Sequence, residues 1–84
     1  MKYDDYDTGD MYELQDGSGY AVRETISGIE VYQVTRKGEY KFLFEMKGDG
    51  MGDYLTEDEN GEDEIDDYKL SDAISSFEDV TQWA

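Results

Sequence analysis

Charge is distributed so unevenly along this chain that its middle is the segment most suited to a packed sheet. Residues 17–48 carry four acids and five bases, whereas residues 1–16 and 49–84 have net charges of −5 and −12. Nine acids and no base fall within residues 53–67. We therefore expect a charge-balanced sheet flanked by two acidic ends, with strong mutual repulsion between the acids.

Few aliphatic residues are available to build a core. Leu, Ile, Val and Phe account for 15 of 84 residues, and together with a net charge of −16 this composition is typical of disordered chains. Eight Tyr, three Phe and one Trp offset the shortage, because each aromatic side chain can bury on the order of 150–250 Å². Since the aromatic residues are periodic in the sequence, we expect a folded core.

Alternation of apolar and polar residues predicts an antiparallel meander of three to five strands. The clearest hairpin joins two alternating segments through Arg36-Lys37-Gly38, where Gly38 can adopt the positive φ of a tight turn. In the second segment every other residue is aromatic or Met, which predicts a half-buried strand. Those alternating residues are Tyr40, Phe42, Phe44 and Met46, and strands are expected at 11–14, 20–26, 29–35, 39–46 and 53–56.

The C-terminal segment changes to helical spacing and predicts one amphipathic helix over residues 70–84, with Ser71 or Asp72 as its N-cap. The predicted fold is a single α+β domain, in which this helix packs on one face of the meander. The expected parts are an acidic N-terminal segment (1–10), the meander (11–56), an acidic loop (57–69) and the helix. The apolar stripe consists of Leu70, Ala73, Ile74, Phe77, Val80 and Ala84.

The composition argues against catalysis and against a cofactor. The chain has no Cys and no His, which leaves no thiolate nucleophile, no zinc or iron–sulfur ligand set and no base to activate a Ser. Paired carboxylates carry little information where acids are so abundant. No apolar signal segment or membrane span is visible, so we expect a cytoplasmic protein.

Two short motifs give only weak evidence for a function. A calcium loop centred on Gly61 would place Thr56 at its first position and Asp67 at its twelfth, where Asp and Glu are required, so Asn60-Gly61 is better explained as a turn. The acidic Tyr motif at residues 3–7 is expected to belong to a solvated terminus. Its Tyr side chains could become ordered on a partner.

The acidic run is the strongest candidate site. In extended backbone, carboxylates at i, i+2 spacing repeat every 6.6–6.8 Å or so, close to the roughly 6–7 Å between phosphates along a nucleic-acid strand. Tyr54 and Tyr68 bracket the run and are typical interface anchors. The predicted partner-binding residues are Asp53, Tyr54, Glu57, Asp58, Glu59, Glu62, Asp63, Glu64, Asp66, Asp67 and Tyr68, joined by Asp4, Asp5, Asp7 and Asp10.

These features favour a non-catalytic mimic of the DNA or RNA phosphate backbone that blocks the nucleic-acid-binding surface of a basic protein. In size, charge and lack of catalytic residues the chain resembles phage anti-CRISPR and anti-restriction inhibitors, a likeness of class that no shared motif supports. The resemblance implies a CRISPR effector, a restriction enzyme or another DNA-processing enzyme as partner. Direct binding to nucleic acid or membrane is not expected, and the chain is expected to be a monomer or dimer.

The alternative is a small adaptor that binds a basic segment without displacing nucleic acid, for instance by strand addition at an open sheet edge.

Overall fold

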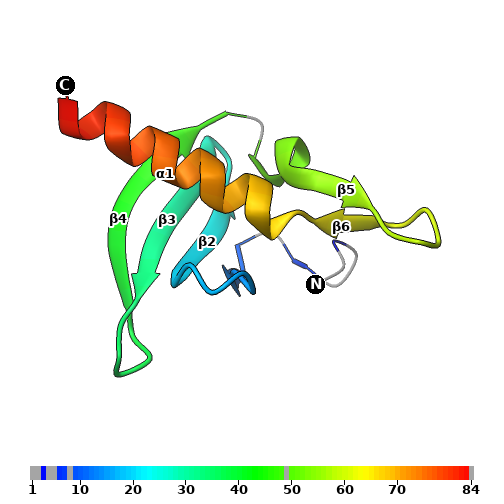
Figure 1. Ribbon diagram of the computed structural model, residues 1–84, viewed down its shortest axis with the longest axis horizontal. Coiled ribbons are helices and arrows are strands. Elements are labelled where there is room, and N and C mark those ends of the chain that lie inside the picture. Colours follow the sequence, from blue (N-terminus) through cyan, green and yellow to red (C-terminus); the bar gives the residue numbers. More distant parts are fainter. Residues whose placement is uncertain (1–2, 4–5, 8, 49, 84) are drawn as a thin grey trace.

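The predicted α+β fold is confirmed: a four-stranded antiparallel meander is crossed on one face by a C-terminal helix (Figure 1). This computed structural model describes residues 3, 6–7, 9–48 and 50–83, with side chains described as far as Glu78. The strands of the meander pair in sequence order, and a separate two-stranded hairpin precedes the helix. The elements are β1 (Met11–Glu13), β2 (Tyr20–Thr25), β3 (Gly28–Val34), β4 (Tyr40–Lys47), the 3-10 helix η2 (Gly50–Tyr54), β5 (Leu55–Glu57), β6 (Asp63–Ile65) and α1 (Asp67–Trp83).

The core lies between the sheet and α1. Val22 and Val31 are paired across β2 and β3, and both are fully buried with the helix residues Leu70 and Ile74. Phe77 continues the helical stripe and stacks on Phe44 of β4, with ring centroids 4.8 Å apart. The predicted stripe is therefore the buried face of the helix as far as Phe77, while the side chains of Val80 and Ala84 lie outside the described residues.

Strand β4 does not keep the simple alternation that its sequence predicts. The register with β3 shifts by one residue, so that Val31 pairs with Phe44 while Tyr32 pairs with Phe42. A one-residue bulge of this kind moves the side chains that follow it to the other face. Phe44 consequently packs against the core, whereas Phe42 and Tyr40 keep 53% and 43% of their surface exposed.

Two Tyr residues of the N-terminal acidic segment also pack more closely than expected. Tyr6 is only 7% exposed and belongs to the core, and its hydroxyl accepts a hydrogen bond of 2.9 Å from the backbone N–H of Glu24. Tyr3 stacks on Tyr6 with ring centroids 6.3 Å apart. The prediction of a solvated terminus is therefore wrong for Tyr6, because the phenol fills the core and accepts a hydrogen bond from a backbone amide of β2.

The predicted acidic loop 57–69 and the helix start at residue 70 also need correction. Most of that segment is the β5–β6 hairpin, and α1 begins at Asp67. Asp66 is the N-cap in place of Ser71 or Asp72, because its carboxylate accepts a hydrogen bond of 3.1 Å from the N–H of Lys69. An anion at this position is also stabilised by the helix dipole.

A single glycine allows the close approach of β3 to the end of β4. Gly28, the first residue of β3, has a φ of +150°. A Cβ atom there would collide with the carbonyl oxygen of Met46. Only glycine therefore lets β3 pair tightly with the end of β4.

None of the helices that the structure describes is long and apolar enough to cross a bilayer.

Candidate acidic binding surface

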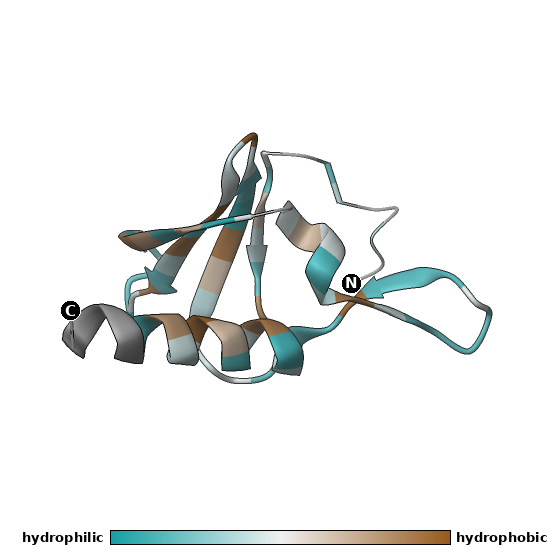
Figure 2. Cartoon of the chain, turned by 90° about the horizontal axis from the view of Figure 1, so that it is seen from above, coloured by the Kyte–Doolittle hydropathy of each residue, from teal (hydrophilic) through white to brown (hydrophobic). Residues whose placement is uncertain are grey.

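The β5–β6 hairpin carries much of the acidic run and projects away from the sheet (Figure 1). Its inner pair, Leu55 and Ile65, is anchored in the core. Beyond this pair the hairpin is polar, as the hydrophilic colouring of the projecting arm shows (Figure 2). The acids are thus gathered on one arm of the molecule.

The outermost ladder pair places two like charges opposite each other. Glu57 faces Asp63 directly across the strands, and both residues are exposed. Like charges at directly paired positions destabilise a hairpin. Neither residue forms an ion pair with any residue that the structure describes.

The sheet shows the opposite arrangement. There Glu30 pairs with Glu45 across β3 and β4, but Arg23 forms an ion pair with Glu30. The hydrogen bond from Arg23 lowers the pKa of Glu30 below its usual range. The like charges of the sheet thus have a neutralising base, which Glu57 and Asp63 lack among the described residues.

Asp58 organises the tip of the hairpin. Its Oδ1 accepts hydrogen bonds from the backbone N–H groups of Asn60, at 2.9 Å, and Glu62, at 3.0 Å. Gly61 completes the turn with a φ of +77°. Asp58 and Gly61 therefore build a turn, and no group of three acids in the described part of the chain is arranged to hold a metal ion.

The turn interrupts the predicted single file of carboxylates. Glu57 and Asp63 lie on one face of the hairpin and Glu64 on the other, since neighbouring strand residues alternate. The regular i, i+2 series is therefore not present over the whole run, because residues 58–62 form the bend. What the fold keeps is a cluster of carboxylates on both faces of one arm, with Glu57, Glu59, Glu62 and Asp63 exposed.

Two predicted site residues at the base of the hairpin have structural partners. Asp66 caps α1, and its backbone N–H donates to the carbonyl of Tyr54 at 2.7 Å. Asp67 accepts hydrogen bonds from the hydroxyl of Tyr12 at 2.5 Å and from the N–H of Gln15 at 3.0 Å. The Asp66 carboxylate therefore caps the helix, and the Asp67 carboxylate joins the helix start to the sheet.

The remaining predicted residues lie in different surroundings. Tyr54 packs against the core, and burial, with the negative charge of Asp53, raises its pKa. Tyr68 on the first turn of α1 is 76% exposed. Asp7 and Asp10 are exposed ahead of β1, whereas Asp4 and Asp5 lie outside the described residues.

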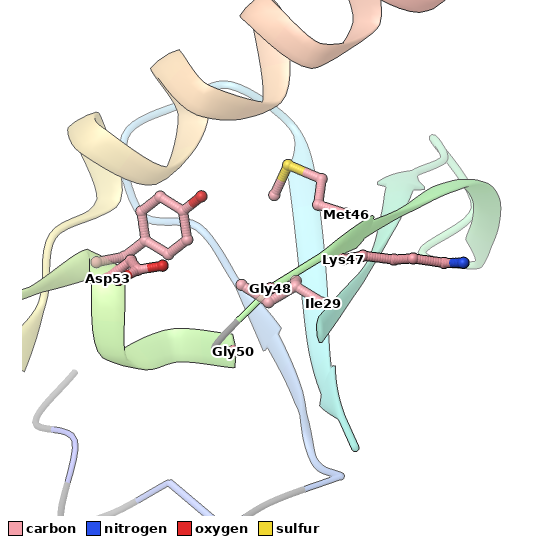
Figure 3. A pocket seen from close by; sticks show the side chains of 7 residues that line it. Ile29, Met46, Lys47, Gly48, Gly50 and Asp53 are labelled. Atoms are coloured by element: carbon pink, nitrogen blue, oxygen red, sulfur yellow. The ribbon is translucent and has the colours of Figure 1, made fainter. Parts of the chain in front are cut away.

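Beside the base of the hairpin lies a groove that is not part of the predicted site. It runs between α1 and the end of β4, has a volume of about 390 Å³ and opens to solvent. A smaller hollow of about 30 Å³ continues it past η2 (Figure 3). The small residues Ala73 and Ser76, one helical turn apart, are the sequence signal that could have indicated it. The groove is lined by Met46, Lys47, Tyr54, Ala73, Ser76 and Phe77, and the hollow adds Ile29, Gly48, Gly50 and Asp53.

Comparisons of the chain with protein-family profiles, curated proteins and solved structures give no match.

Proposed function

We propose that this protein is a non-catalytic inhibitor that mimics the phosphate backbone of DNA or RNA and occupies the nucleic-acid-binding surface of a basic partner. The supporting observation is the projecting hairpin on which Glu57 faces Asp63 with no described base between them. Such an arrangement costs stability and becomes favourable when cations from another molecule approach. Lys and Arg side chains that hold phosphates are suitable cations.

The mechanism is stoichiometric occupation of a site. The carboxylates of the arm attract a Lys- and Arg-lined channel over long range, which speeds association and makes it sensitive to salt. Exposed Tyr68, near the base of the arm, adds contact area that depends less on salt. The chain needs no catalytic residue and no cofactor for this role.

The partner class follows from the same chemistry. A CRISPR effector, a restriction enzyme or another DNA-processing enzyme has a basic channel of the required kind. An inhibitor of such enzymes acts in the bacterial cytoplasm and is encoded by a phage. Each of these assignments belongs to the proposal.

Competition with nucleic acid is the direct test. Purified effectors and restriction enzymes are loaded with fluorescent DNA, and the protein is titrated in at several salt concentrations. We expect displacement of the DNA from at least one target, with an affinity that falls as salt rises. A target that binds the protein equally well with and without saturating DNA would contradict mimicry.

A pair of double variants locates the surface. Glu57→Lys with Glu59→Lys, and Glu13→Lys with Glu39→Lys, each replace two exposed acids and change the net charge from −16 to −12. The hairpin variant should lose most of its ability to displace DNA, while the control pair should keep it. Equal losses in both would show that total charge, and not the arm, determines binding.

The adaptor alternative has its own structural support. β4 is an edge strand of the meander, and Tyr40 and Phe42 are exposed beside that edge. A partner strand can add to such an edge through main-chain hydrogen bonds. If Phe42→Ala abolishes binding of a target while the hairpin variant does not, the adaptor is the correct function.

A further inference from the structure

The groove beside η2 combines an apolar lining with one carboxylate. Met46, Ala73 and Phe77 supply its apolar surface, with Ala73 and Phe77 on the same face of α1. Asp53 lines the hollow that continues it, and both are lined by Met46, Lys47 and Tyr54. An apolar channel therefore ends at a negative charge.

Two charged residues line this channel, Asp53 in the hollow and Lys47 in both parts. Figure 3 shows the Asp53 carboxylate turned toward the hollow, whereas the Lys47 side chain extends away from it. Among residues that the structure describes, Asp53 forms no ion pair. The pKa of Tyr54 is raised by burial and by the charge of Asp53, which agrees with a partly dry site next to this carboxylate. A ligand for this channel should be long, apolar along its stem and cationic at its end.

We propose that the groove receives one arginine side chain of the basic partner, with the aliphatic stem along Met46 and Phe77 and the guanidinium paired with Asp53. This inference rests on the proposed function and adds an anchor to it. The arm supplies long-range attraction, and the groove fixes where the partner sits. The volume, about 390 Å³, lies at the low end of the roughly 300–1,000 Å³ of ligand pockets.

Arginine fits this site better than lysine. A guanidinium is planar and weakly hydrated, and it can bind a carboxylate through two parallel hydrogen bonds, whereas an ammonium is a strongly hydrated point charge. Binding in a partly apolar groove therefore desolvates Arg at lower cost. The same Arg side chains hold phosphates in nucleic-acid-binding proteins, so the ligand is one that a phosphate mimic would meet.

Short blocked peptides test the site without a known target. Gly-Arg-Gly and Gly-citrulline-Gly have side chains of nearly the same shape, but only arginine is charged. In methyl NMR, the Arg peptide should shift the Met46 and Ala73 signals saturably, and the citrulline peptide should bind about tenfold more weakly. Equal shifts from both peptides, or shifts confined to the hairpin, would overturn the proposal.

Variants at neighbouring positions give the matched control. Ser76→Leu fills the groove, while Ser75→Leu makes the same change at an exposed helix position outside its lining. Ser76→Leu and Asp53→Asn should each weaken the Arg peptide about tenfold, and Ser75→Leu should not. If Ser76→Leu keeps its fold by circular dichroism and still binds normally, the groove is not the site.

The DNA-displacement assay separates this inference from the function on which it rests. If the hairpin variant loses displacement and Ser76→Leu retains it, the arginine site is wrong and the mimicry stands. If Arg peptide binds in the groove but no target releases its DNA, the site is correct and the mimicry is wrong.

Discussion

The Tyr12 hydroxyl donates a hydrogen bond of 2.5 Å to the carboxylate of Asp67, although 55 residues separate the two in sequence. This contact joins β1 to the first turn of α1. Because it lies where the hairpin ends and the helix starts, it stabilises the base of the acidic arm as well as the core.

Removing this hydroxyl should destabilise the whole domain. Tyr12 is buried, and hydrogen bonds to charged groups contribute about 1.5–3 kcal/mol. We expect Tyr12→Phe to lower the free energy of unfolding by about that amount in urea denaturation. Tyr68→Phe makes the same change at an exposed site and should alter it by less than about 0.5 kcal/mol; similar effects of the two would refute the assignment.

Buried phenols should make the protein sensitive to alkali. Burial raises the pKa of Tyr6, Tyr12 and Tyr54 above the usual value of 10.0. The unfolded chain then loses these protons first as the pH rises, so their stabilisation is complete below about pH 10 and is lost through the higher folded pKa values. The urea midpoint should therefore fall as the pH rises above about 10, and less steeply in Tyr12→Phe. A parallel profile for that variant would contradict this explanation.

Neutralising the paired acids of the hairpin should stabilise the fold. Glu57→Gln removes the repulsion with Asp63, and we expect the free energy of unfolding to rise by about 0.2–1 kcal/mol at low salt. The gain should shrink as salt screens the charges, while Glu39→Gln should give no comparable gain. Stabilisation accompanied by weaker DNA displacement would show that the acids act in binding. Destabilisation by Glu57→Gln would contradict the repulsion between Glu57 and Asp63.

The bulge in β4 predicts unequal effects for two neighbouring Phe residues. Phe44 stacks on Phe77, whereas Phe42 contacts Tyr32 edge-on and is half exposed. Phe44→Ala should cost about 2–3 kcal/mol, somewhat less than a fully buried Phe, and Phe42→Ala about 1 kcal/mol or less. Equal losses in thermal denaturation would indicate an unbroken alternation.

Glycine 28 provides a steric test of the β3–β4 contact. A Cβ at Gly28 would meet the Met46 carbonyl, whereas one at Gly52 would have no neighbour within 4 Å. Gly28→Ala should destabilise the protein by about 1–3 kcal/mol, and Gly52→Ala by less than about 0.5 kcal/mol. Comparable melting temperatures for the two variants would be inconsistent with this packing.

The meander and the helix could be predicted from sequence because local periodicity determines them. The bulge could not, since Leu43 is apolar and hides the extra residue within an apparently regular alternation. The burial of Tyr6 and the contacts of Asp67 depend on residues far away in the chain. Local patterns contain no information about such partners.

The sequence predicts which segment forms the candidate site, but not the hairpin that this segment folds into or the role of each carboxylate. Composition identifies residues 53–67 as the acidic run, and Asn60-Gly61 within it predicts a turn but not the strands on both sides. Asp58, Asp66 and Asp67 have the same side chain as Asp63, and only the fold distinguishes the turn-forming, capping and bridging carboxylates from an exposed one. The groove depends on the docking of α1, and its only trace in the sequence is the pair of small residues Ala73 and Ser76.

The hairpin continues into α1 with a single residue, Asp66, between strand and helix, and that residue is bonded on both sides. The acidic arm is therefore a stiff extension of the core, without a hinge of its own. Binding of a partner to this arm therefore avoids the entropic cost of ordering that a flexible tail would have. When the protein is heated, or the arm is pulled, the arm and the core should therefore unfold together as one event.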